Sequence, residues 1–169
     1  GINFNGLKNE IGVFSPAEYV LLDTEFLKTL DTRNLLSGYA EMLKHGIIST
    51  ESHWAELLKF DINHIDYEEL KRLVAQSVQI KEDIVEQDPF EKGIRKALNV
   101  GHTVGHAFES LALELNQHVL HGYAVAWGIV CELYFSFSQY FCQSLAFLMF
   151  LYLLDTQFSC FQFPLFLLS

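Results

Sequence analysis

The feature that most limits how this chain can fold is the helical spacing of its apolar residues from Thr24 to about Leu133. The clearest example runs from Asp66 to Glu86, where apolar residues fall on one side of a helix and charged residues on the other. Asp88-Pro89 ends that helix, because the residue before a proline disfavours the helical conformation. Similar spacing predicts further helices that begin near Thr24, Thr32, Leu98 and His121. The chain is therefore predicted to be mainly α.

The two ends of the chain differ from this helical middle. Residues 1–23 are punctuated by glycine and proline and predict loop and strand, with a short buried strand at Tyr19–Asp23. Residues 135–169 form a tail rich in Phe and Leu without helical periodicity. The stretch 141–168 is long enough to be a membrane candidate only if Asp155 is tolerated within it. The pattern divides the chain into three segments: 1–23, 24–134 and 135–169.

Composition narrows the class of function. A net charge of -10 argues against a nucleic-acid-binding protein, which needs a basic surface. It does not exclude a small anionic substrate, because a local group of Lys and Arg residues can override the global balance. Three cysteines without CxxC spacing are typical of a reduced, cytoplasmic protein. The sequence begins at Gly1 without a signal-peptide pattern or an initiator Met, so we expect further residues upstream.

A group of histidines is the main candidate for chemistry. His102 and His106 are four residues apart and share one face of a helix. His121 lies beyond a loop and is able to return to the same point, with His118 as the alternative by spacing alone. Imidazoles that converge with one further ligand can hold a divalent metal and leave a position open for substrate. The alternative is that these histidines pack in the core. Gly101 and Gly105 precede His102 and His106, and each glycine costs about 1 kcal/mol of helix stability. That cost is explained if another group must approach the backbone closely at these positions.

Carboxylate and cationic residues accompany the histidines. Glu41 has apolar neighbours at helical spacing, so it faces inward or toward a cleft, where a carboxylate needs a cation or a hydrogen-bonding partner; a surface Glu paired with a basic neighbour is the alternative. Lys44, Lys81 and Arg95 are candidate anion-binding residues, and Asn99 lies four residues after Arg95. Solvated helix charges are the alternative for each.

A glycine-punctuated loop adds candidate phosphate contacts at Lys8 and Asn9. The histidines in polar settings are interpreted as surface residues: His45, His53 and His64.

Six segments in the right order resemble the 3-dehydroquinate synthase family, which belongs to the sugar phosphate cyclases. The most diagnostic is Gly93–His106, which contains the string Leu98-Asn-Val-Gly-His102-Thr-Val-Gly-His106. The others are Leu7–Phe14, Asp23–Leu30, Gly38–Gly46, Ile80–Lys81 and Leu120–Ala126. The family joins an α/β domain to an all-α domain. The resemblance therefore implies that residues 24–134 are the helical metal- and substrate-binding domain, and that residues 1–23 are a remnant of the N-terminal NAD-binding domain.

The resemblance also implies a role for each matching residue. The zinc ligands are Glu41, His102 and His121, whereas His106, a fourth ligand by spacing, corresponds to a substrate-site histidine. The residues that match the substrate site are Lys44, Lys81, Arg95, Asn99, Asn9 and Glu91. The residues that match NAD contacts are Lys8, Phe26, Leu27, Lys28 and Thr29.

The chemistry implied by the resemblance converts 3-deoxy-D-arabino-heptulosonate 7-phosphate to 3-dehydroquinate and phosphate, in the shikimate pathway of aromatic amino acid biosynthesis. It needs NAD and Zn²⁺, with Co²⁺ suited to the same ligands. NAD is reduced and reoxidised within one turnover, and cationic side chains hold the anionic substrate in one pose. The resemblance further implies a small phosphorylated sugar acid as partner, a homodimer in the full-length protein, no nucleic acid and no membrane.

The sequence departs from the family in two places. The glycine-rich NAD loop and a Gly-Gly-Lys-Thr segment of the family are not in this chain, so we expect these 169 residues alone to be inactive. Residues 135–169 do not look native to the family, and a shifted reading frame or a wrongly joined gene is our hypothesis for them. The alternatives in function are another sugar phosphate cyclase, a metal-dependent polyol dehydrogenase, and a non-enzymatic helical domain or small membrane protein.

Overall fold

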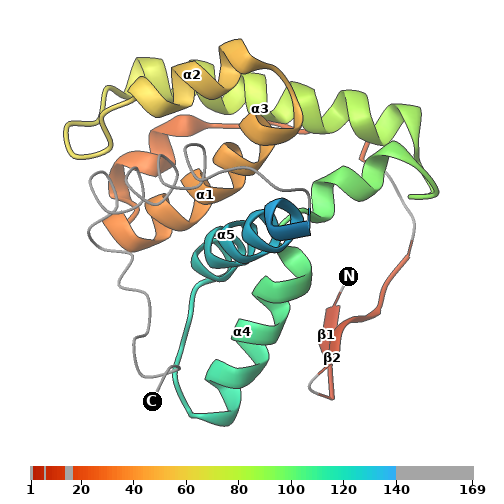
Figure 1. The fold of residues 1–169 in the computed structure, drawn as a ribbon. Coiled ribbons are helices and arrows are strands. Elements are labelled where there is room, and N and C mark those ends of the chain that lie inside the picture. The colour runs from red at the N-terminus through yellow and green to blue at the C-terminus, as the bar shows by residue number, and fades with distance from the viewer. Residues whose placement is uncertain (1, 6, 14–16, 140–169) are drawn as a thin grey trace.

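The computed structural model describes residues 2–5, 7–13 and 17–139, and this part of the chain is mainly helical (Figure 1). The predicted fold class is thereby confirmed. Its elements are β1 (Ile2–Phe4), β2 (Leu7–Ile11), the 3-10 helix η1 (Thr24–Thr29), α1 (Thr32–Ile48), α2 (Glu51–Lys59), α3 (Tyr67–Gln87), the 3-10 helix η2 (Ile94–Asn99), α4 (His102–Glu114) and α5 (His121–Gln139).

Short polar side chains begin three of the α-helices. Asp31 accepts a hydrogen bond from the backbone of Asn34 at the start of α1, and Thr50 accepts one from His53 at the start of α2. At the start of α3, the Asp66 carboxylate accepts the N–H groups of both Glu68 and Glu69. Each cap satisfies backbone donors that have no partner inside the helix.

Periodicity located some elements better than others. It predicted α3 over Asp66–Glu86, and the helix occupies Tyr67–Gln87. The predicted helix near 98–113 is divided, because η2 ends at Asn99 and α4 begins only at His102. The break is at Gly101, whose left-handed φ of 80° turns the chain between the two. Helix α2 was not predicted.

The N-terminal residues form a two-stranded antiparallel sheet of β1 and β2. The prediction of a short buried strand at Tyr19–Asp23 is wrong. Those residues are in no strand, and Leu21 is 95% exposed. Apolar character alone does not make a strand, which also needs a neighbouring strand to accept its backbone hydrogen bonds.

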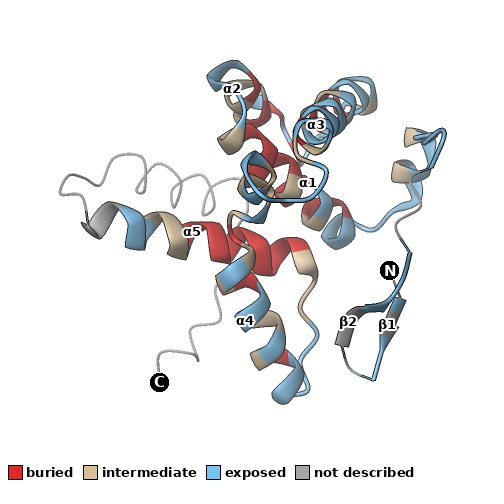
Figure 2. Cartoon of the chain, turned by 90° about the vertical axis from the view of Figure 1, so that its right-hand side faces the viewer, coloured by how far each residue is buried: buried red, intermediate tan, exposed pale blue. Residues whose placement is uncertain are grey.

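Helix α5 is the central element of the described part, and its residues 122–130 are buried, as the red ribbon in Figure 2 shows. Tyr123 and Trp127 belong to a core that α5 shares with α1, α2 and α3, in which Leu57 and Leu73 are fully buried. Val125, Ile129 and Val130 form a smaller core that partly buried residues of the neighbouring segments extend. The packing of α5 therefore sets where its first residue, His121, lies.

Glycines allow α5 to approach its neighbours closely. A Cβ at Gly128 would collide with the carbonyl oxygen of Gly101, and a Cβ at Gly105 would press against the backbone of Ala124. On the other side, a Cβ at Gly122 would collide with the carbonyl oxygen of Ser37 in α1. Gly101 and Gly105 predicted that another group approaches the backbone closely, and that group is α5.

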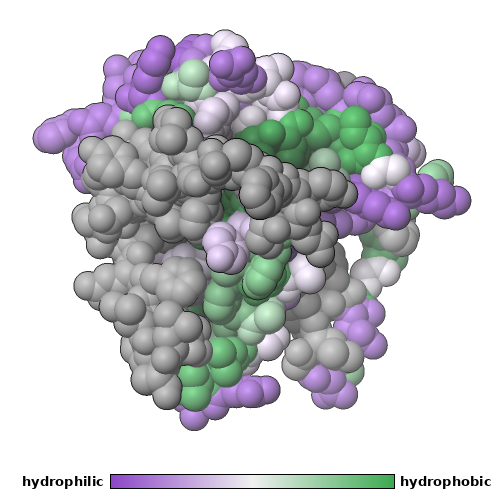
Figure 3. Space-filling model, in the orientation of Figure 1, coloured by the Kyte–Doolittle hydropathy of each residue, from purple (hydrophilic) through white to green (hydrophobic). Residues whose placement is uncertain are grey.

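The outer face of the bundle is polar. Figure 3 shows hydrophilic side chains gathered over α2 and α3 at the top of that view. Within the residues that the structure describes, no helix is both long and apolar enough to cross a bilayer. Of the predicted tail, residues 135–139 belong to the end of α5. The rest of the tail, with the membrane candidate at 141–168, lies outside the described residues.

Candidate metal centre

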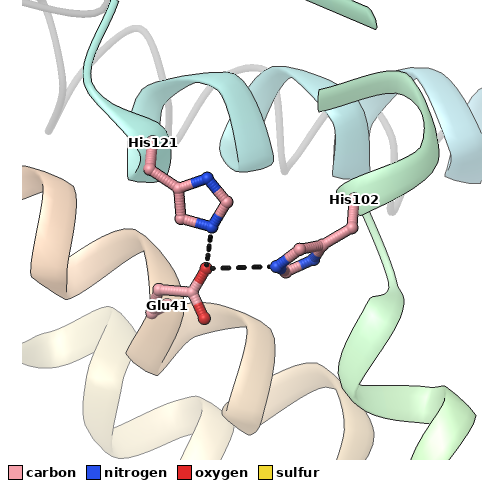
Figure 4. Close-up of side chains that lie close together, drawn as sticks. All are labelled: Glu41, His102 and His121. Atoms are coloured by element: carbon pink, nitrogen blue, oxygen red, sulfur yellow. Dashed lines mark ion pairs between the residues drawn. The ribbon is translucent and has the colours of Figure 1, made fainter. Parts of the chain in front are cut away.

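Three side chains from three helices meet at one point (Figure 4). Glu41 comes from α1, His102 is the first residue of α4, and His121 is the first residue of α5. The Oε1 atom of Glu41 lies 3.7 Å from Nε2 of His102 and 3.5 Å from Nε2 of His121. One ligand atom from each residue lies within 4.8 Å of the other two. A carboxylate and two imidazoles at this spacing are a common protein ligand set for a divalent metal.

Contacts between the helices fix the two histidines. The Glu132 carboxylate of α5 accepts the backbone N–H of Gly101 at 2.7 Å and that of Val104 at 3.2 Å. It thus caps the start of α4, where His102 stands. The backbone N–H of Gly122 donates to the Ser37 hydroxyl at 2.9 Å, which anchors the start of α5 to α1.

The charges at this point suit a cation. Burial raises the pKa of Glu41, but the hydrogen bond and charge of Lys44, with smaller contributions from His102 and His121, outweigh it, so the pKa is lowered. Glu41 is therefore ionised at neutral pH. Burial and the charge of Lys44 lower the pKa of His102, which favours its neutral, metal-binding form.

The two oxygens of Glu41 have different surroundings. Oε2 accepts a hydrogen bond from Nζ of Lys44 at 2.5 Å. Oε1 is buried and has no hydrogen-bond partner among the described residues. A buried, ionised oxygen that faces two imidazole nitrogens needs a cation or donor to offset its desolvation. The residues present therefore fit a divalent metal.

Two other predicted site residues lie beside the cluster. The ring centre of His106 is 5.5 Å from that of His102 and 5.7 Å from that of His121. The Lys44 side chain is buried next to Glu41. The alternative of a surface Glu–Lys pair is only half right, because the pair exists but Lys44 is only 4% exposed.

The loop between α3 and α4 organises a second group of predicted residues. The Asn99 side chain donates a hydrogen bond to Oε1 of Glu91. Arg95 donates through its guanidinium to the Pro89 carbonyl oxygen at 2.9 Å. The Asp88 carboxylate accepts the backbone N–H groups of this loop, including that of Arg95 at 3.1 Å. Lys81 lies exposed on α3.

The predicted NAD contacts lie in the N-terminal elements. Lys8 and the predicted substrate contact Asn9 are in β2. The other predicted NAD contacts form most of η1, in which Lys28 pairs with Glu25 at 2.8 Å and Leu27 packs against the helical core. Phe26 is 74% exposed, and the Thr29 hydroxyl donates to its carbonyl oxygen.

The interpretation of His45 and His53 as surface residues is wrong. Both are buried, and Nε2 of His53 lies 3.3 Å from the Ser77 hydroxyl oxygen. Each follows a polar residue in the sequence, but packing between the helices buries both side chains. His64 is exposed, as predicted, and it pairs with Asp61.

Two glutamates near the site were assigned no role from the sequence. Glu109 follows His102 by seven residues and His106 by three, a helical spacing that placed it on the same face. Glu132 has no such local signal, because it acts across the α4–α5 contact.

Comparison with known proteins supports the resemblance. A family model described as 3-dehydroquinate synthase C-terminal matches residues 38–159, and one described as 3-dehydroquinate synthase N-terminal matches residues 1–37. The two matched ranges meet inside α1, and the first of them continues past residue 135. The division of the chain at 23/24 and 134/135 stays a prediction.

Curated relatives carry the same description. A 3-dehydroquinate synthase of Parabacteroides distasonis is 60% identical over 136 residues, which are 80% of this chain and 38% of that protein. One of Streptococcus pyogenes is 44% identical over 78% of this chain and 36% of its own length. A bifunctional 3-dehydroquinate synthase/phosphatase of Fusobacterium nucleatum is 42% identical over 78% of this chain and 20% of its own. The chain thus spans well under half the length of these relatives. It belongs to the 3-dehydroquinate synthase family.

Proposed function

We propose that this chain supplies the metal- and substrate-binding part of a 3-dehydroquinate synthase. The reaction is the conversion of 3-deoxy-D-arabino-heptulosonate 7-phosphate to 3-dehydroquinate and phosphate. The observation that carries the proposal is the convergence of Glu41, His102 and His121 from three helices. The names of the curated relatives favour this branch over other sugar phosphate cyclases and over a polyol dehydrogenase.

Glu41, His102 and His121 would hold Zn²⁺ or Co²⁺. When bound, such an ion acts as a Lewis acid toward a substrate hydroxyl. The chain's own residues prepare that position, because Lys44 keeps Glu41 ionised while burial keeps His102 neutral. Lys44 also places a buried positive charge beside the metal position, where it attracts an anionic substrate.

The remaining polar residues would hold the substrate. Asn99 and Glu91 form one hydrogen-bonded pair, and Arg95 is held in the same loop by the Pro89 carbonyl oxygen. Residues positioned in this way restrict the substrate to one pose, which lowers the entropic part of the barrier. Lys81, His106 and Asn9 complete the proposed substrate set.

The cofactor, partner and location are proposals of the same kind. NAD, when bound, accepts and returns a hydride, and Lys8 with Phe26–Thr29 would touch it. A homodimer and a cytoplasmic location are inferred from the family resemblance, and no nucleic-acid partner is expected at a net charge of -10. The expectation that these 169 residues alone are inactive stays a prediction. An assay of phosphate release by the purified chain tests it, and measurable release would contradict it.

Zinc content tests the metal centre directly. We expect one equivalent of zinc in the wild-type chain and well below one in the H102A variant, because removal of one of three protein ligands opens the site. The matched control is H64A, which removes an exposed histidine paired with Asp61. Elemental analysis after dialysis measures the content. Equal zinc in wild type and H102A, with both folded by circular dichroism, contradicts the proposal.

A further inference from the structure

We propose that Glu109 is a positioning residue for the metal centre, holding His121 with Nε2 turned toward the metal position. This inference rests on the proposed function and deepens it. Glu109 lies in α4, and its carboxylate bridges two histidines. Oε1 lies 3.0 Å from Nδ1 of His121, and Oε2 lies 2.7 Å from Nδ1 of His106.

The contact with Glu109 selects the tautomer of His121. A carboxylate only accepts hydrogen bonds, so Nδ1 of His121 carries the hydrogen. In a neutral imidazole the lone pair is then on Nε2, the atom that lies 3.5 Å from Oε1 of Glu41. A carboxylate behind a metal-binding histidine fixes its ring in this way and raises its basicity.

His102 reaches the same state by a different contact. Its Nδ1 lies 3.3 Å from the Val100 carbonyl oxygen, which is also only an acceptor, and its Nε2 lies 3.7 Å from Oε1 of Glu41. Both imidazoles therefore present Nε2 to the same carboxylate oxygen. The Nε2 lone pairs of both rings are then available to one cation beside that oxygen.

A second metal site at Glu109 is the alternative, because ligand atoms of His106, Glu109 and His121 also lie within 4.8 Å of one another. The distances argue against it. Both histidines already contact Glu109 at hydrogen-bond length. An ion there would sit about 2.0–2.2 Å from each ligand atom, and it would take the Nδ1 of His121 that the hydrogen bond to Glu109 uses.

The Glu109 bridge also joins His121 to His106, the residue assigned to the substrate site. The two rings stack with centres 5.7 Å apart, and the His106 side chain is about half exposed. One carboxylate thus orients a proposed metal ligand and a proposed substrate contact together.

Zinc affinity of the 169-residue chain tests the inference without an activity assay. A competition titration with a chromophoric zinc chelator would compare wild type with E109A, E109Q and the control E114Q, an exposed glutamate on the same helix. We expect E109A to bind zinc about 10–100-fold more weakly. E109Q should lose less, because its amide oxygen still accepts from His121, and E114Q should match wild type. Circular dichroism and urea unfolding establish that each variant is folded.

The tautomer of His121 gives a second readout that needs no variant. Long-range ¹H–¹⁵N spectra of the metal-free wild-type chain should show His121 with its hydrogen on Nδ1. A hydrogen on Nε2 overturns the inference, as does equal zinc affinity in wild type and E109A. Two zinc equivalents in wild type with one lost in E109A overturn it in favour of a second metal site. A wild-type chain that binds no zinc overturns the proposed metal centre instead, while the His121 spectrum still decides the role of Glu109.

Discussion

At the scale of single residues, the metal position depends on how Glu41 divides its two oxygens. Oε2 accepts from the buried Lys44, and Oε1 faces the two histidines. The neighbouring ammonium offsets the cost of keeping a partly buried carboxylate charged. The site is therefore ready for a cation before one arrives, because Glu41 does not need to lose a proton first.

Buried His45 makes the stability of the chain depend on pH. Burial, and next the charge of Lys44, lower the pKa of His45 from 6.5 to about 4. Between these values the unfolded chain binds a proton that the folded chain does not, so the contribution of His45 to the free energy of unfolding falls as pH falls from 6.5 to 4. At about 1.4 kcal/mol per pKa unit, the loss approaches ~3 kcal/mol at the acid end.

The H45Q variant tests this dependence. Urea unfolding at several pH values should give a shallower decline between pH 6.5 and 4 in H45Q than in wild type, whatever its stability at neutral pH. H64Q is the matched control, because it removes an exposed histidine. A decline in H45Q that runs parallel to that of wild type would show that His45 titrates normally.

At the scale of elements, the contact between α4 and α5 places both proposed histidine ligands. Gly128 of α5 lies against the carbonyl of Gly101 and the backbone of Gly105. Glu132 adds two hydrogen bonds across the same contact. The separation of His102 from His121 is thus set by backbone packing and a helix cap.

Replacing Gly128 should therefore disrupt both stability and the metal site. In G128A the new methyl group collides with backbone atoms, which cannot move aside as a flexible side chain can, so α4 and α5 are forced apart. We expect a lower free energy of unfolding in urea and weaker zinc binding.

The control is G38A, the same substitution in α1, where a Cβ meets nothing within 4 Å. That variant should gain up to about 1 kcal/mol from the higher helix propensity of alanine. If G128A is as stable as G38A, the close contact between the two helices does not hold in solution.

The elements that the sequence predicted are those whose signals are local. Helix α3 has one apolar face and a capping Asp66, and its bounds were predicted to within one residue. The prediction of a strand at Tyr19–Asp23 was wrong because a strand must pair with a neighbouring strand, which a local pattern cannot reveal. The prediction that His45 and His53 are surface residues was wrong for the same reason, because packing between helices buries both side chains.

The candidate site divides along the same line. Spacing alone grouped His102 with His106 and left His118 as an alternative to His121, because the position of α5 was unknown. The resemblance to the family selected Glu41, His102 and His121, the set that the structure brings together. Glu132 was beyond prediction, since its contact joins positions far apart in the sequence.

At the scale of the whole molecule, the candidate metal centre lies where the parts of the bundle join. Helix α1 packs with α2, α3 and α5 in the main core, while α4 contacts chiefly α5 (Figure 1). Glu41 stands on α1, and the two histidines stand at the starts of α4 and α5. A cation bound by all three would add a direct link between α1 and α4, which otherwise depend mainly on α5 to hold them together.

Zinc should therefore stabilise the folded chain as a whole. An ion that binds the folded form only, present at 100 times its dissociation constant, adds about 2.7 kcal/mol to the free energy of unfolding. The midpoint of urea unfolding should rise with zinc, return on addition of a chelator, and stay unchanged by zinc in H102A. An equal rise in wild type and H102A would mean that zinc acts elsewhere on the chain. Amide hydrogen exchange locates the effect, because protection gained on zinc binding should be concentrated in α4, which contacts chiefly α5 and would gain a direct link to α1.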